Sequence, residues 1–221
     1  MGSLAVIKYL HGLDQDITLF INNLSNPATD QFWMFMSDKA VWIPAYVLCA
    51  YFLFRRLGWK KALIVIASAG IAFALCDQLS NIVKHSVDRL RPSYDHRMLT
   101  EGLTVLERRG GFFGFFSAHA ANAFAFAVCL IIGFRNDKRH TYKAFTISAL
   151  TWAALVAASR IFVGKHYFGD VLVGTLVGMG IGYCCGMLAR HAIRRFVDRA
   201  PSTAPSGSSP SGHHGSPSQG Q

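Results

Sequence analysis

The chain has 221 residues, which is enough for one domain with a sizeable core. Hydrophobic residues make up 52% of it and charged residues only 15%, whereas soluble domains usually carry about 25% charged residues. This composition argues against a soluble helical protein, because too little polar surface remains to solvate the apolar stretches. The formal net charge of +10 could suggest a nucleic-acid partner. The positions of the cations, described below, argue against that partner.

The N-terminal segment, residues 1–38, precedes the first long apolar stretch. Lys8 and His11 interrupt its first apolar run, so we expect no cleavable signal peptide. Leu13–Leu24 then alternates polar and apolar residues at helical spacing. We interpret it as an interfacial helix that lies on the membrane. A helix packed against the rest of the protein is the alternative. A hidden sixth span in this segment would move the N-terminus to the other side of the membrane.

Five apolar stretches follow, and each is a candidate membrane-spanning helix. A bilayer core of about 30 Å needs about 20 helical residues, and flanking Trp, Tyr or Phe can extend a shorter stretch into the interface. The stretches cover about residues 40–56, 62–83, 118–134, 144–159 and 171–189. We therefore predict an all-α fold: an integral membrane helical bundle of about five transmembrane helices plus the N-terminal interfacial helix, in one domain of residues 1–199.

The cations are distributed unevenly between the two ends of this bundle. Twelve of them flank the spans on one side, if the spans simply alternate: Arg55, Arg56, Lys60, Lys61, Arg135, Lys138, Arg139, Lys143, Arg190, Arg194, Arg195 and Arg199. This is the positive-inside pattern, so that side is predicted to be cytoplasmic in a multi-pass protein of the cell (inner) membrane. The opposite loops also carry cations, which runs against the topological bias and suggests an anionic ligand.

Two further features concern packing and the C-terminus. Glycine occupies every fourth position from Gly174 to Gly186, a face that lets helix backbones approach closely. We expect this face to pack inside the bundle, with a homodimer contact as the alternative. Residues 200–221 are rich in Ser, Pro and Gly and lack a hydrophobic pattern, so a disordered tail is predicted.

Three segments concentrate polar residues at what alternating topology makes the same membrane face. They are Lys84–Pro92 at the end of the second span, Phe116–His119 at the start of the third, and Ser159–Asp170 between the fourth and fifth. Because the spans were assigned without these residues, their agreement on one face predicts a site there.

The residue types in these segments suit phosphoryl transfer. Lys84, Arg91 and Arg160 would bind phosphate oxygens, and guanidinium groups match them in a bidentate fork. Ser117 can donate a hydrogen bond, and the amides that begin at Ala118 form a helix N-terminus that favours anions.

Two histidines and an aspartate complete the set. His119 and His166 titrate near neutral pH, so one can attack while the other moves a proton. Asp170 follows His166 by four residues and would share its face on a helix, where it could accept the ring N–H and fix the tautomer. Other polar residues of the loop Pro92–Phe116, Glu107 among them, could contact the lipid head group, but most of them are interpreted as solvated.

The pattern of these residues resembles a known family. Lys-x6-Arg-Pro, then Ser-x-His, then Ser-Arg-x5-His-x3-Asp is similar to the three motifs of the type 2 phosphatidic acid phosphatase superfamily, over roughly residues 40–190. The resemblance implies a bacterial membrane lipid phosphatase without a metal or other cofactor. It implies that His166 is the nucleophile that forms a phosphohistidine, that Asp170 orients it, and that His119 is the general acid. Lys84, Arg91, Ser117, Ala118 and Arg160 would hold the phosphoryl oxygens.

The middle motif departs from the family's Pro-Ser-Gly-His. Phe116 replaces the proline and Ala118 the glycine, so a methyl group is expected near the phosphate. Because Ser117 and His119 remain, we expect a change in rate or substrate and not a loss of activity.

Several functions stay open at this point. The first is a phosphatase for a membrane-embedded lipid phosphate or diphosphate, with undecaprenyl diphosphate or lipid A favoured and phosphatidylglycerol phosphate as another substrate. The second is a lipid phosphotransferase that uses a polyprenyl diphosphate donor. The third is a non-catalytic lipid-binding or transport protein with a cationic mouth.

Overall fold

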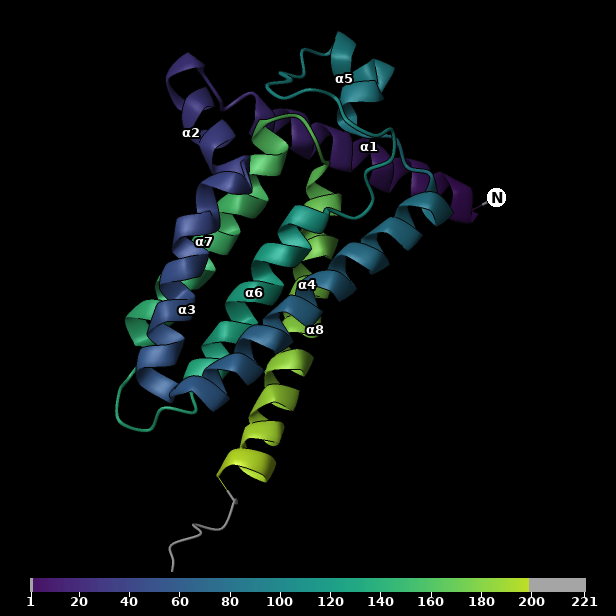
Figure 1. The fold of residues 1–221 in the computed structure, drawn as a ribbon. Helices are drawn as coiled ribbons and strands as arrows, with labels where there is room; N and C mark the ends of the chain where they lie inside the picture. Colours follow the sequence, from purple (N-terminus) through teal and green to yellow (C-terminus); the bar gives the residue numbers. More distant parts are fainter. Residues whose placement is uncertain (1, 199–221) are drawn as a thin grey trace, which may run out of the picture.

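The computed structural model describes residues 2–198, and the predicted tail lies outside them. Figure 1 shows a bundle of long helices with shorter helices gathered at one end, which we call the outer end. Within the described residues every regular element is a helix and no strand is formed. The prediction of an all-α membrane bundle is confirmed.

Two helices precede the bundle. α1 (Gly2–Asn22) lies across the outer end (Figure 1) and is longer than the predicted Leu13–Leu24. α2 (Pro27–Ser37) was not anticipated, although its start is marked in the sequence. The side chain of Asn26 accepts hydrogen bonds from the N–H groups of Ala28 and Thr29, and the Thr29 hydroxyl accepts one from Asn26 N–H. This reciprocal capping box fixes where α2 begins.

The predicted spans are long helices. They are α3 (Ile43–Leu57), preceded by the short 3-10 helix η1 (Ala40–Trp42), α4 (Trp59–Val87), α6 (Ala118–Phe134), α7 (Lys143–Phe162) and α8 (Phe168–Ala192), which continues into the π-helical η3 (Ile193–Val197). Among the described residues, four helical stretches are long and apolar enough to cross a membrane, and α6 is slightly shorter. The predicted number of about five holds, and several helices extend beyond their predicted ends.

α6 is the central helix of the bundle. It packs against α4, α7 and α8, and 12 of its 17 residues are buried. The predicted glycine face of α8 makes its contact with α6. A β-carbon added at Gly174, Gly178 or Gly182 would come closer than 3.0 Å to a backbone oxygen of α6 or of the residue just before it. The glycine face is therefore used for packing within the chain.

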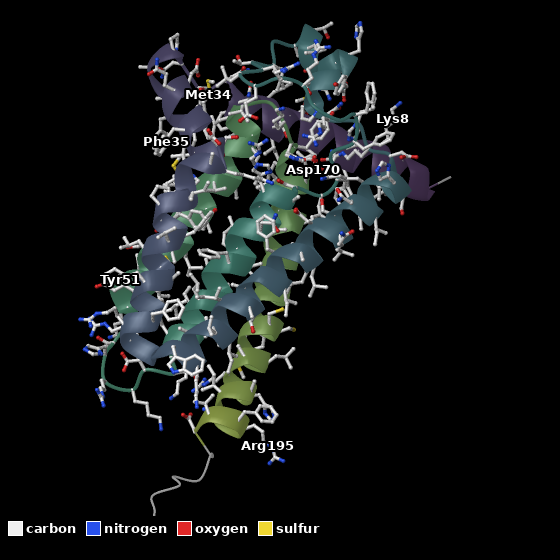
Figure 2. The ribbon with its side chains drawn as sticks, in the orientation of Figure 1. Lys8, Met34, Phe35, Tyr51, Asp170 and Arg195 are labelled. Carbon is white, nitrogen blue, oxygen red and sulfur yellow. The ribbon has the colours of Figure 1, made fainter. Side chains whose placement is uncertain are left out.

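The two ends of the bundle differ in their connections. The outer end carries the long loop between α4 and α6, which contains η2 (Pro92–Tyr94) and α5 (His96–Thr100). The other end has the tight α3–α4 turn at Gly58, the α6–α7 loop and the end of η3 (Figures 1 and 2). The predicted cytoplasmic cations up to Arg195 flank these latter connections, and Arg195 is labelled there in Figure 2. Arg199 lies outside the described residues.

Candidate active site

Backbone hydrogen bonds join the three predicted segments at the outer end. Ser117 N–H donates to the carbonyl of Asp170 at 3.0 Å, which connects the start of α6 to the first turn of α8. Gly114 N–H donates to the carbonyl of Arg89 at 2.9 Å, which connects the loop before α6 to the segment after α4. The structure therefore brings together all three segments that the sequence singled out.

His166 lies in the turn between α7 and α8 and is only 2% exposed. It precedes α8, which begins at Phe168, so the expectation that His166 and Asp170 share one helix was wrong. The turn still brings the two together, with His166 Nδ1 3.5 Å from Asp170 Oδ2. This distance is longer than the hydrogen bond that was predicted to fix the tautomer, and Nδ1 makes no hydrogen bond to any described residue.

Burial lowers the pKa of His166 well below its usual range, and the nearby charges of Arg91, Arg160 and Lys84 lower it further. Removing an imidazolium from water costs free energy, and neighbouring cations add to that cost. The ring is therefore neutral at neutral pH. A neutral imidazole has the free lone pair that a nucleophile requires.

Asp170 is fully buried, and its two oxygens face different partners. Oδ2 accepts a hydrogen bond from Tyr167 N–H at 3.1 Å and also faces His166. Oδ1 accepts one from Arg89 Nη1 at 2.8 Å. Sequence reasoning had not placed Arg89 in the site, although it lies inside the Lys84–Pro92 segment.

The predicted phosphate-binding cations lie within electrostatic reach of His166. Lys84 lies in the last turn of α4, and Arg91 donates from Nε to the carbonyl of Phe113 at 3.1 Å. Arg160 is 4% exposed, and its Nε has no hydrogen-bond acceptor among the described residues. A buried guanidinium with an unused donor is costly unless an anion satisfies it.

Glu107 lies within this cationic group, although its loop was expected to be solvated. Its Oε1 is 3.3 Å from Arg160 Nη1, and its Oε2 is 3.7 Å from Lys165 Nζ. The hydroxyl of Ser37 also donates to it. The sequence carries no local signal for this contact, because Glu107 lies in an irregular loop 53 residues before Arg160.

The start of α6 places the remaining predicted residues. Ser117 is the N-cap, and its side chain accepts from Ala120 N–H at 3.5 Å. Ala118 is the first residue of α6, so its N–H belongs to the helix N-terminus, as predicted. His119 follows it and lies within electrostatic reach of Arg160, His166 and Lys84.

His119 also borders two cavities. The first is lined by both polar and apolar side chains, among them Glu107, Lys39 and residues of α2. The second is apolar, has a volume of about 670 Å³, and extends between α3, α4, α6 and α7. Apolar side chains such as Trp42, Phe126 and Trp152 line it. His119, the predicted general acid, therefore lies where the cationic group adjoins a space suited to a hydrocarbon chain.

Gly114 is a site residue that sequence reasoning missed. A β-carbon on it would lie 3.1 Å from Arg91 Cγ, 3.2 Å from Asp170 Oδ2 and 3.6 Å from His166 Nδ1. The backbone here thus forms one wall of the His166–Asp170 contact, and only glycine leaves that space free.

Known proteins resemble this chain in sequence and in fold. Residues 61–198 match the PAP2 superfamily. A lipid A 4'-phosphatase of Bacteroides thetaiotaomicron is 31% identical over 89% of this chain and 85% of its own length. An undecaprenyl-diphosphatase of Bacillus subtilis is 26% identical over 87% of this chain and 86% of its own. The crystal structure of a phosphatidylglycerolphosphate phosphatase from Bacillus subtilis has the same fold, with a TM-score of 0.65 at 21% identity over 85% of this chain and 89% of that one.

Proposed function

This chain is a member of the PAP2 superfamily and a multi-pass membrane lipid phosphatase, and we propose that it removes a phosphate from a lipid of the lipid A class through a phosphohistidine on His166. The observation that carries the mechanism is the buried, neutral imidazole of His166 among three cations, with an unused donor on Arg160. The similarity to lipid A 4'-phosphatases supports this substrate class. Undecaprenyl diphosphate is the second candidate substrate, because an undecaprenyl-diphosphatase aligns over most of the chain.

In the first step, Nε2 of His166 attacks phosphorus while the bond to the lipid oxygen breaks. His119 gives its proton to that leaving oxygen, because a lipid alkoxide is a poor leaving group without protonation. Lys84, Arg91 and Arg160 stabilise the charge on the phosphoryl oxygens, together with Ser117 and the Ala118 amide. The negative charge of Asp170 stabilises the positive ring of the phosphohistidine.

In the second step, His119 accepts a proton from water, and the resulting hydroxide attacks the phosphohistidine. The P–N bond breaks, inorganic phosphate leaves, and His166 is again neutral. The apolar cavity beside His119 would hold part of the lipid's hydrocarbon while the phosphate lies at the outer end. We place this end at the periplasmic face of the inner membrane, because the predicted cytoplasmic cations flank the other end.

The test is phosphate release by the purified protein in detergent, with a chelator present. The panel contains lipid A phosphate, undecaprenyl diphosphate and phosphatidylglycerol phosphate. We expect release to be fastest from lipid A phosphate and to be abolished in His166→Ala. His191→Ala, at the opposite end of α8, is the matched control and should retain wild-type activity. Wild-type rates in His166→Ala would refute the mechanism, and transfer of labelled phosphate to a lipid hydroxyl would identify a phosphotransferase.

His119→Ala separates the acid from the nucleophile. Substrates with good leaving groups need less protonation, so this variant should lose less activity on an aryl phosphate than on an alkyl phosphate. Equal losses on both substrates would argue against the acid role.

A further inference from the structure

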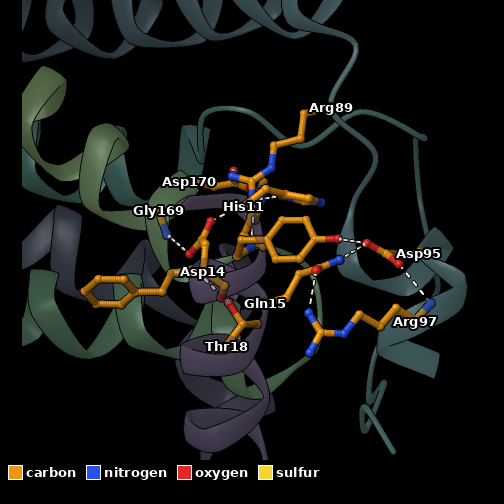
Figure 3. A network of polar contacts seen from close by, with 12 residues as sticks. His11, Asp14, Gln15, Thr18, Arg89, Asp95, Arg97, Gly169 and Asp170 are labelled. Atoms are coloured by element: carbon orange, nitrogen blue, oxygen red, sulfur yellow. Dashed lines mark hydrogen bonds and ion pairs between the residues drawn. The ribbon is translucent and has the colours of Figure 1, made fainter. Parts of the chain in front are cut away.

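α1 directs one polar face at the active site, although it contributes nothing to the three motifs. His11, Asp14, Gln15, Thr18 and Asn22 stand at positions i, i+3, i+4, i+7 and i+11, so they share a face of the helix. Figure 3 shows Asp14 of this face beside Arg89 and Asp170. Thr18 and Asn22 are fully buried. Buried polar side chains require partners, and those found here belong to the catalytic end of the bundle.

Arg89 connects α1 to the catalytic aspartate. Its Nη1 lies 2.8 Å from Asp170 Oδ1, and its Nη2 lies 2.6 Å from Asp14 Oδ2 (Figure 3). The guanidinium also lies over the Tyr167 ring, 4.1 Å from the ring centroid, which limits its freedom to rotate. One guanidinium is thus shared between two carboxylates that are 156 positions apart in the chain.

α1 also binds the first turn of α8, the helix that carries Asp170. Asp14 Oδ1 accepts a hydrogen bond from Gly169 N–H at 2.7 Å, and Thr18 Oγ1 accepts one from Phe168 N–H at 3.0 Å. The first N–H groups of a helix have no partner within the helix, so α1 supplies the missing acceptors. A β-carbon on Gly169 would lie 2.8 Å from Asp14 Oδ2, which indicates how closely the two helices approach.

We propose that Asp14 is a positioning residue of the phosphatase reaction, acting through Arg89 on Asp170 and from there on His166. The proposal rests on the function proposed above. With Asp14 ionised, the Arg89 charge is divided between two carboxylates, and the group of three carries a net negative charge beside His166. That charge favours the positive ring that forms when His166 attacks phosphorus. Without Asp14, Arg89 can turn both nitrogens toward Asp170 and draw its carboxylate away from His166.

The first experiment compares Asp14→Asn with Asp16→Asn. Asp16 is a matched control, since it lies on the same helix and pairs with Arg97 at 2.6 Å, but its side chain is 61% exposed. Asp14→Asn should lower kcat about tenfold or more, because a small displacement of a reactive side chain from its working geometry can cost up to about 100-fold in rate. KM should change little, and the loss should be the same for good and poor leaving groups, unlike that of His119→Ala. Asp16→Asn should retain the wild-type kcat.

A double mutant tests whether Asp14 acts through Arg89. If it does, Arg89→Gln combined with Asp14→Asn loses no more kcat than Arg89→Gln alone. If the two losses multiply, Asp14 acts independently of Arg89 and the proposal is wrong.

Thr18→Ala separates positioning from capping. This variant removes a cap of α8 and leaves the charges in place, so its melting temperature should fall while kcat stays within about twofold of wild type. A kcat loss equal to that of Asp14→Asn would show that capping explains both, and a wild-type kcat in folded Asp14→Asn would also overturn the proposal. A wild-type protein that releases no phosphate from any lipid would instead refute the proposed function.

Discussion

Gly114 lies directly against Asp170, since a β-carbon on Gly114 would be 3.2 Å from Asp170 Oδ2. The same β-carbon would be 3.6 Å from His166 Nδ1, so it would press on the contact between the two catalytic side chains. The φ of Gly114 is not in the left-handed region, and an alanine there is crowded without backbone strain.

We therefore predict that Gly114→Ala lowers kcat by about tenfold or more, because it displaces the reactive side chains, while the melting temperature changes little. Gly111→Ala is the matched control, because it lies in the same loop and its β-carbon would meet no atom within 4 Å. Initial rates on one lipid phosphate, with thermal unfolding of each purified variant, measure both effects. If Gly114→Ala were as active as Gly111→Ala, the geometry assigned to Asp170 would be wrong.

Glu107 places a carboxylate in the group of cations that is expected to bind phosphate. It neutralises part of the charge of Arg160 and Lys165, so an entering phosphate must compete with it. Burial lowers the pKa of Lys165, and the Glu107 charge opposes that effect. Glu107→Gln removes the competing charge, and we predict that inorganic phosphate then inhibits several-fold more strongly.

The measurement is the inhibition constant of inorganic phosphate against lipid hydrolysis. Glu101→Gln serves as the control, because Glu101 forms an exposed ion pair with Arg97 at 2.7 Å, away from the cationic group. Weaker inhibition in Glu107→Gln would mean that Glu107 helps to assemble the anion site instead of competing for it.

The pH dependence follows from the lowered pKa of His166. A histidine outside a protein titrates near pH 6.5, but burial and three cations keep this ring neutral below that pH. Protonation of His166 at low pH should lower kcat/KM, and this acid limb of the pH profile should therefore lie below pH 6.5. In Arg91→Gln one of the cations is lost, so the imidazolium becomes easier to form and the limb moves to higher pH.

Arg91→Lys keeps the charge and should leave the limb where it is, which makes it the control. The measurement is the pH profile of kcat/KM for the wild type, Arg91→Gln and Arg91→Lys on one substrate. Ionisation of the substrate phosphate then affects all three profiles equally. An acid limb that does not move in Arg91→Gln would show that another group governs it.

The bundle could be predicted from the sequence more fully than the contacts inside it. Long apolar stretches define spans because the bilayer imposes a minimum length, and alternating topology then brings the three motifs to one end. Nothing local in the sequence couples Asp14 to Arg89 or Glu107 to Arg160, since each pair forms only when distant segments meet. The extent of α1 was underestimated because residues 5–10 are exposed, so no stripe of buried apolar residues marks this part of the helix in the sequence.

The α6–α8 contact gives a prediction about stability. A β-carbon at Gly178 would overlap the backbone of Ala121, and backbone atoms cannot move aside as a flexible side chain can. Gly178→Ala should force the two helices apart and destabilise the protein by about 1–3 kcal/mol. Gly180→Ala lies on the same helix and would meet no atom within 4 Å, so its effect should be small or slightly stabilising, since alanine is the better helix former. Thermal unfolding in one detergent compares the two variants. Equal melting temperatures would mean that α8 does not pack on α6 through its glycine face.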